Sequence, residues 1–188
     1  MENRHEESEA WELVSLDGVM ERPEEWAFSY SDDEMGEASA SGMAASDVLL
    51  LEGVTYENLA AYWPNQPGGK PMVDYLNCVP KYVVSGTLEG LLAWNNSTII
   101  RGNIAEEIAR LKRQPGKDIT ILGSGTLLRS LLRDGLLDEL TLLVHPVVLG
   151  SGKLLFEDRS DARALKLASS RTFGTGVVPL AYRPADKG

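Results

Sequence analysis

The chain has few of the residues that build metal sites and disulfides. Its 188 residues include one cysteine, Cys78, and two histidines, His5 and His145. A single cysteine cannot close an internal disulfide, and these three side chains are too few for the usual zinc site. We therefore expect no bound metal, an inert Cys78, a buried strand position for His145 and a cytoplasmic protein.

Long apolar runs and a basic leader are absent as well. No stretch approaches the ~20 apolar residues that are needed to cross a bilayer. The opening residues, Met1-Glu2-Asn3-Arg4-His5-Glu6-Glu7, contain neither the basic nor the apolar region of a secretory signal. We expect a protein that does not associate with membranes.

Basic residues are scarce near the start of the chain. The net charge is −10, and residues 1–37 hold 13 acidic side chains against two basic ones, Arg4 and Arg22. The rest of the chain is almost neutral, with 15 acidic and 16 basic residues. A nucleic-acid-binding protein needs a basic face, so that class is excluded. The acidic region is either a solvated segment or an electronegative lip over a site for a neutral or cationic ligand.

What the chain does contain is a regular alternation of strand and helix signals. The strand signals lie at residues 11–16, 48–51, 81–85, 97–100, 119–122, 140–145, 165–173 and 177–182. The helical signals lie at residues 31–45, where Ser31 and Glu34 form a capping box, and at residues 55–62, 103–114 and 126–134. Residues 63–79, rich in proline and glycine, are expected to form a surface loop.

This order predicts an α/β fold in one domain. Strands that alternate with helices form a mainly parallel central sheet that is flanked by helices, and the last two strands should form an antiparallel hairpin. We expect an acidic N-terminal segment at residues 1–10, followed by the domain at residues 11–188. The residues His5-Glu6-Glu7-Ser8-Glu9 are polar, so we expect the first strand to be shortened or to begin only at Ala10, and to leave an open edge.

The most informative stretch is residues 119–135. A short apolar strand, Ile119-Thr120-Ile121-Leu122, runs into Gly123-Ser124-Gly125-Thr126, and leucines at helical spacing follow up to Gly135. Glycines let a backbone approach an anion closely, and the free N–H groups of the first helical turn point at it. This pattern predicts a phosphate-binding turn.

Several segments together resemble the dihydrofolate reductase-like family, in the branch that contains the reductase domain of riboflavin biosynthesis. They are Val14-Ser15-Leu16-Asp17-Gly18-Val19, Ser31-Asp32-Asp33-Glu34-Met35-Gly36, Leu49-Leu50-Leu51 with Thr55-Tyr56-Glu57, Lys81-Tyr82-Val83-Val84-Ser85, Ile121 to Leu127, and His145 to Gly152. They occur in the family's order over almost the whole chain after Trp11. The resemblance implies that NADPH lies across the strand ends, that a small heterocycle lies beside its nicotinamide, and that the protein is a homodimer.

The resemblance and the local chemistry together give a set of candidate site residues. The cofactor-binding candidates are Gly123, Ser124, Gly125, Thr126, Thr55 and Ser85; the substrate-binding candidates are Ser15, Trp26, Tyr30 and Tyr56; and the catalytic candidates are Asp17, Asp33 and Glu52. Two of the catalytic candidates also have plain structural explanations. Asp17-Gly18 is a good turn, and Asp33 is a residue type that a helix N-terminus prefers.

The chain departs from the family where the 2′-phosphate of NADPH would bind. Gly53 and Gly86 stand where the family has arginines, and Glu52 replaces a glycine. A charge-assisted bond to phosphate contributes roughly 1.5–3 kcal/mol, so the loss of two weakens NADPH by about 10²–10⁴-fold. NADH, which lacks this phosphate, becomes more plausible, with Glu52 accepting a ribose hydroxyl. The spacing of Lys81, Arg101 and Lys117 gives no reason to place any of them at this subsite.

Three functions follow from the sequence. The first is a reductase that uses NADPH or NADH and acts on a small carbonyl, imine or heterocyclic substrate. The second is a cofactor-independent cyclase, isomerase or dehydratase in which Asp17, Asp33 and Glu52 supply acid–base chemistry. The third is a non-catalytic ligand-binding protein.

Overall fold

The computed structural model describes residues 7–90, 92–156 and 162–185. Its strands are β1 (Ser8–Ser15), β2 (Ser46–Glu52), β3 (Lys81–Val84), β4 (Ser97–Ile100), β5 (Asp118–Leu122), β6 (Glu139–His145), β7 (Leu165–Ser170) and β8 (Val178–Pro184). Its helices are α1 (Asp33–Ala45), α2 (Gly53–Tyr62), α3 (Pro71–Cys78), α4 (Ile104–Lys112) and α5 (Gly125–Asp134), with short 3₁₀ turns η1 (Pro23–Glu25), η2 (Phe28–Tyr30) and η3 (Trp63–Asn65).

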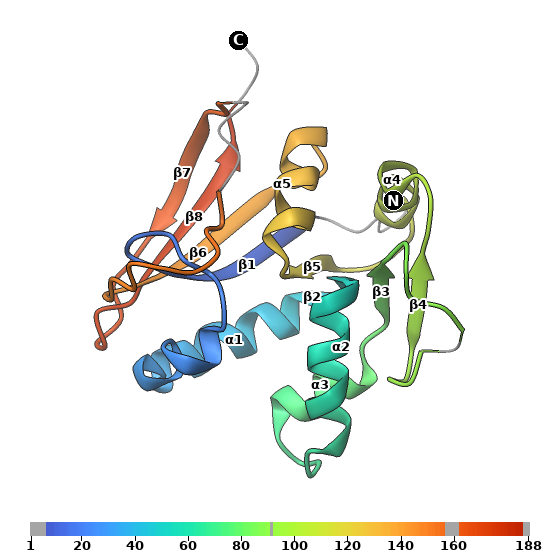
Figure 1. Ribbon diagram of the computed structural model, residues 1–188, viewed down its shortest axis with the longest axis horizontal. Helices are drawn as coiled ribbons and strands as arrows, with labels where there is room; N and C mark the ends of the chain where they lie inside the picture. The colour runs from blue at the N-terminus through green and yellow to red at the C-terminus, as the bar shows by residue number, and fades with distance from the viewer. Residues whose placement is uncertain (1–6, 91, 157–161, 186–188) are drawn as a thin grey trace.

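In the described part of the chain, eight strands form one sheet in the order β4-β3-β2-β5-β1-β6-β8-β7. The strands from β4 to β6 run parallel, while β8 is antiparallel to β6 and β7 is antiparallel to β8. Helices α4 and α5 cover one face of the sheet, and α1, α2 and α3 cover the other (Figure 1). The predicted α/β fold with its C-terminal antiparallel hairpin is confirmed.

Strand β2 shows why the sheet is buried on both faces. Val48 and Leu50 pack in the cluster under α4 and α5, whereas Leu49 and Leu51 pack against α2 and α3. A strand that is covered on both sides reads as a continuous apolar run and not as an alternating one. The run Val48-Leu49-Leu50-Leu51 therefore predicts the central position that β2 occupies.

All four predicted helices are present, with ends that differ from the predictions by at most two residues. The predicted capping box at α1 is wrong, because Asp32 is the N-cap and accepts a hydrogen bond from the Met35 N–H at 2.9 Å. Glu34 instead accepts a hydrogen bond from the backbone N–H of Gly174. This bond ties the start of α1 to the turn between β7 and β8.

The prediction of a loop at residues 63–79 is wrong, because η3 and α3 lie within it. Pro71 occupies the first turn of α3, where a proline costs the helix no hydrogen bond. Val73 and Leu76, three positions apart, are both buried, and Leu76 packs in the cluster that contains Leu49 and Leu51. The proline and glycine residues that precede Pro71 concealed this short helix.

The prediction of a short first strand is also wrong. β1 begins at Ser8 and is central in the sheet, between β5 and β6, so it leaves no open edge. The backbone N–H of Ser8 donates to Asp138 at 2.8 Å, and its hydroxyl donates to the carbonyl of Leu136 at 2.6 Å. Residues 1–6 of the predicted acidic segment lie outside the described residues. Within the described residues, no helix is both long and apolar enough to cross a membrane.

Candidate functional site

The carboxyl ends of the parallel strands meet at one edge of the sheet, and most of the predicted site residues follow these ends. Trp11 and Leu51 both lie beside Leu122 in the register, so β2 and β5 end beside the middle of β1, which extends four residues further to Ser15. At the same edge Ser15 of β1 pairs with His145 of β6. Clefts at the carboxyl edge are the usual ligand sites of open parallel sheets.

The predicted phosphate-binding turn connects β5 to α5. Gly123 has a φ of +50°, a conformation that favours glycine, and the Gly123–Ser124 peptide bond is cis. Ser124 is the N-cap of α5, and its hydroxyl oxygen accepts a hydrogen bond from the Leu127 N–H at 3.3 Å. The N–H groups of Gly125 and Thr126, in the first turn of α5, have no acceptor within the helix. This geometry fits an anion such as a diphosphate.

Thr55 of α2 packs directly against this turn. A Cβ atom built on Gly123 would lie 3.0 Å from the Thr55 hydroxyl oxygen. The glycine therefore allows the first turn of α2 to approach the first turn of α5. The structure brings Thr55 and the turn together, as the set of cofactor-binding candidates requires.

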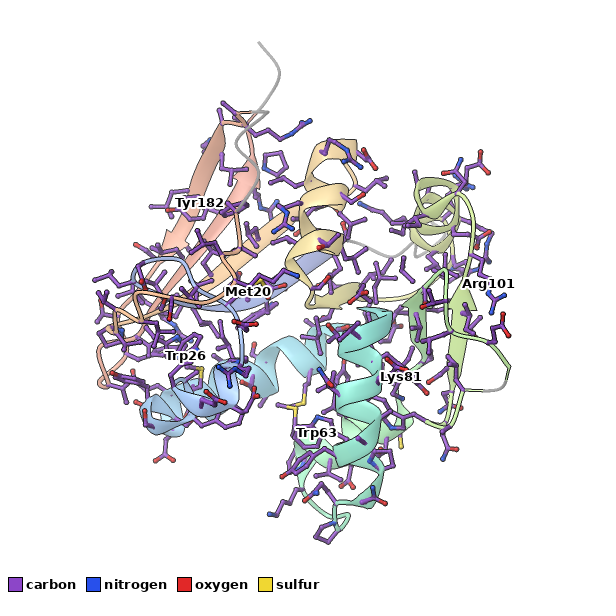
Figure 2. All side chains as sticks on the ribbon, viewed as in Figure 1. Met20, Trp26, Trp63, Lys81, Arg101 and Tyr182 are labelled. Atoms are coloured by element: carbon purple, nitrogen blue, oxygen red, sulfur yellow. The ribbon has the colours of Figure 1, made fainter. Side chains whose placement is uncertain are left out.

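Arg129 is a cation at the turn that the sequence analysis missed. Its guanidinium donates to the carbonyl oxygen of Leu155 at 2.6 Å and to the hydroxyl oxygen of Thr126 at 3.3 Å. A Cβ atom on Gly125 would lie 3.0 Å from this guanidinium and 2.8 Å from the sulfur of Met20, whose place is shown in Figure 2. The available signal was the i, i+3 spacing of Thr126 and Arg129 on the helix.

Asp17 connects two loops at the carboxyl edge. It accepts hydrogen bonds from the Ser15 hydroxyl at 2.6 Å and from the backbone N–H groups of Leu149 and Gly150 at 3.2 and 2.8 Å. These bonds, with that of Ser15 the strongest, lower the pKa of Asp17 to about 2. A carboxylate that is ionised and bonded in this way can hold a loop in place, but it is poorly suited to donating a proton.

Trp26 and Tyr30 come together around His145 on the α1 face of the sheet. Their ring centroids lie 5.3 and 5.7 Å from the imidazole, both in edge-to-face geometry. His145 is fully buried, and its Nδ1 lies 2.8 Å from the carbonyl oxygen of Leu143. Burial lowers the pKa of His145, against the opposing effect of the Leu143 and Val14 carbonyls. Nδ1 therefore carries the proton, and Nε2, which has no partner among the described atoms, is an acceptor.

Two predicted site residues lie apart from this group. Tyr56 is 3% exposed in the core under α2, where its hydroxyl oxygen accepts the Trp94 N–H at 2.9 Å. Tyr56 therefore belongs to the hydrophobic core. Asp33 lies exposed in the first turn of α1 and has no described contact with the turn that follows β5. It suits the helix N-terminus, as its residue type predicts.

The subsite that lacks arginines lies where β2 and β3 end. A Cβ atom on Gly53 would come within 2.9 Å of the Ser85 hydroxyl oxygen, whereas Gly86 has open space around it. The Ser85 hydroxyl oxygen accepts hydrogen bonds from the N–H groups of Thr87 and Leu88 at 3.2 and 3.1 Å. Glu52, the half-buried last residue of β2, makes no capping bond to α2.

The three cations considered for this subsite have different positions. Lys81 begins β3 at the opposite edge of the sheet, and Lys117, just before β5, donates to the carbonyl oxygen of Ala44 at 2.8 Å, also at that edge. Arg101 alone among the three follows a strand at the carboxyl edge, after β4, where it donates to the carbonyl oxygen of Leu88 (Figure 2). Arg101 is therefore the one of the three that is near this subsite.

Glu12 is a second functional candidate that the sequence analysis missed, because it was counted only among the 13 acidic residues of positions 1–37. It is only 5% exposed and shares a face of β1 with Ala10 and Val14, under α5. Burial raises its pKa to about 8, against a hydrogen bond from the backbone of Gly123. The strand alternation of Ser8, Ala10, Glu12 and Val14 was the available signal.

Comparison with known proteins supports the fold. A sequence model of the RibD C-terminal domain matches residues 11–179. The uncharacterized protein YyaP of Bacillus subtilis (strain 168) is 34% identical over 173 residues, which is 90% of each chain. A crystal structure of a candidate riboflavin biosynthesis protein from Shewanella sp. PV-4 has a TM-score of 0.74 at 18% identity and covers 96% of this chain and 99% of its own. A pyrimidine reductase-like protein from Corynebacterium diphtheriae has a TM-score of 0.67 at 13% identity, covering 96% and 92%.

Proposed function

Because the chain belongs to the RibD C-terminal domain family, we propose that it is a reductase that binds a nicotinamide nucleotide and reduces a small heterocyclic, carbonyl or imine substrate. When bound, the nicotinamide would supply the hydride. The observation that carries the proposal is the turn from Gly123 to Thr126, with its free N–H groups and the Arg129 guanidinium beside it. A permanent cation and a helix N-terminus together suit a diphosphate.

The substrate side of the proposed site is the group formed by Trp26, Tyr30 and His145. Two half-buried aromatic rings suit a planar ligand, and the fully buried His145 packs against both rings and holds them in place. Ser15, next to His145 in the register, keeps the adjacent turn closed, because its hydroxyl oxygen accepts the Val19 N–H at 2.9 Å. We assign Asp17 to holding this turn against Leu149 and Gly150.

We further propose that the cofactor is NADH and not NADPH. Glu52 stands at the end of β2 where a ribose hydroxyl would need an acceptor, and a carboxylate there repels a 2′-phosphate. Gly53 and Gly86 supply no compensating charge. The same features favour the second candidate, a cofactor-independent enzyme on this fold, if neither dinucleotide binds.

A binding titration tests the proposal. We expect NADH to quench tryptophan fluorescence with a dissociation constant in the micromolar range and NADPH to bind at least tenfold more weakly, with calorimetry as the second readout. Absence of binding by either dinucleotide at millimolar concentration would rule out the reductase and leave the cofactor-independent enzyme and the non-catalytic ligand-binding protein.

The substitution Gly86→Arg should recover binding of NADPH. Gly86 has nothing within 4 Å of an added Cβ, so an arginine fits there, whereas one at Gly53 would meet Ser85. One charge-assisted bond to the 2′-phosphate should tighten NADPH about tenfold to a hundredfold and leave NADH within about twofold. Fluorescence titration of both dinucleotides measures this change.

Gly36→Arg is the matched control, because Gly36 also has open space but lies on α1. It adds the same charge away from the subsite and should leave the ratio of the two affinities unchanged. An equal gain for NADPH in both variants would mean that the effect is only one of net charge.

A further inference from the structure

Glu12 is a buried acid at the centre of the molecule. Its register neighbour in β6 is Leu142, and its same-face neighbours in β1 are Ala10 and Val14. All three belong to or pack against the apolar cluster under α4 and α5. A carboxyl group in such surroundings strongly disfavours its charged form.

The Glu12 carboxyl group lies next to the phosphate-binding turn, on the side of the turn that faces the protein interior. Gly123, the first residue of the turn, presents its backbone N–H to the carboxyl group and lowers the pKa of that group against the effect of burial. The Oε1 atom has no hydrogen-bond partner among the described atoms. Burial raises the pKa of Glu12 to about 8, so near neutral pH the carboxyl group is mostly protonated. A neutral acid can keep the bond from Gly123 through one oxygen while the other carries the proton.

An anion at the turn and a charged Glu12 would compete for the same positive end of α5. The helix N-terminus provides a partial positive charge of roughly half a unit, which falls off within one turn. Two negative charges that share this end, one of them in the apolar interior, repel each other with little screening. The anion and the Glu12 proton should therefore bind together.

The other charged groups around the turn leave this argument unchanged. Glu52 follows Leu51, which pairs with Leu122, and its effect on an anion is the same in wild-type protein and in Glu12→Gln. Arg129 of α5 stays charged at all relevant pH values. Asp17, on the loop after β1, is held ionised by its hydrogen bonds. Glu21 and Lys153 are both exposed, and the backbone N–H of Lys153 donates to the Glu21 carboxylate at 3.3 Å. His145 of β6 lies on the opposite face of the sheet, in contact with Trp26 and Tyr30.

We propose that Glu12 is a positioning residue for the anion at this turn, which orients the Gly123 N–H and allows an anion to bind only while it carries its proton. The inference rests on the proposed function only in placing a diphosphate at the turn. It makes binding of the diphosphate a proton-coupled event, which is tuned by a side chain that never touches the ligand.

The test is the pH dependence of binding for two probes, NADH and ADP-ribose. Both contain a diphosphate diester that does not titrate between pH 7 and 9.5, and ADP-ribose lacks the nicotinamide. For the wild-type protein we expect the dissociation constant to rise about tenfold per pH unit above 8, or about thirtyfold between pH 7 and 9.5. For Glu12→Gln, which keeps an oxygen acceptor for Gly123, it should change by no more than about twofold.

Calorimetry at pH 9, in two buffers of different ionisation enthalpy, gives a second readout that needs no variant. Wild-type protein should take up close to one proton per bound ADP-ribose, and Glu12→Gln should take up none. Lys81→Met is the control, because burial lowers the Lys81 pKa to about 8 but this side chain starts β3 at the far edge. That variant should keep the wild-type slope.

The outcomes for the two probes separate the two proposals. If ADP-ribose binds with proton uptake and NADH gains nothing from its nicotinamide, the inference stands and the reductase fails. A dissociation constant that stays flat to pH 9.5 in wild-type protein, or the same slope in Glu12→Gln, overturns the inference. So does a failure of both probes to bind.

Discussion

The Ser124→Asp variant is expected to lose at least about a hundredfold in affinity for NADH while remaining folded. Ser124 caps α5 through its hydroxyl oxygen, which accepts the Leu127 N–H. Aspartate is an equally good N-cap and adds a charge that the helix N-terminus favours. The same carboxylate occupies the place of the diphosphate, and two like charges about 4 Å apart at an effective dielectric of about 20 repel by about 4 kcal/mol.

The measurement is a fluorescence titration of NADH together with a thermal melt. Ser124→Asn is the control, since it keeps the cap without the charge and should bind NADH within about threefold of wild type. The melting temperature of Ser124→Asp should equal or exceed that of wild type. Binding by Ser124→Asp within tenfold of the control would mean that the diphosphate does not lie at this turn.

The Glu12→Gln variant is expected to be more stable than wild type above neutral pH, by about 2–4 kcal/mol at pH 8.5. Burial raises the pKa of Glu12 in the folded state from 4.5 to about 8, so the folded state binds this proton more tightly than the unfolded state does. The resulting stabilisation of the folded state is complete below about pH 4.5. That contribution is lost as pH rises through about 8, at up to about 1.4 kcal/mol per pH unit. Glutamine does not titrate and so removes this loss, although its buried amide retains part of the cost of burial.

Urea unfolding at pH 5, 7 and 8.5 measures this difference. Glu9→Gln is the matched control, because Glu9 lies in the same strand and burial also raises its pKa. Glu9 is less buried than Glu12, and it accepts a hydrogen bond from the Thr141 hydroxyl at 3.1 Å. It should change the pH dependence in the same direction by a smaller amount. If wild type and Glu12→Gln lose stability in parallel between pH 5 and 8.5, the Glu12 carboxyl group is not buried as described.

The misses of the sequence analysis have specific physical causes. The helix α3 was missed because Pro67, Gly68 and Gly69 are strong local breakers, whereas its two buried contacts, Val73 and Leu76, are tertiary. The hydrogen bonds of Asp17 to the loop after β6 could not be predicted from the sequence either, because their donors, Leu149 and Gly150, lie far away in the chain. No local pattern reports such partners.

What the sequence determined by itself is the set of elements whose signals are local. The apolar run of β2, the leucine spacing of α5 and the glycine turn before it each follow from a period or a backbone preference within a few residues. Their order along the chain was enough to predict the parallel sheet and its carboxyl edge.

Only the tertiary structure decided which side chains share that edge. The sheet order places β1 between β5 and β6, which puts Glu12 under Gly123 and His145 beside Ser15. The same arrangement places Arg101 near the subsite that lacks arginines, and it places Lys81 at the opposite end of β3, away from the carboxyl edge. The physical reason is that the pKa of a buried acid and the partner of a cation depend on residues from other elements of the fold, such as Gly123 for Glu12 and Leu155 for Arg129, which no local pattern can specify.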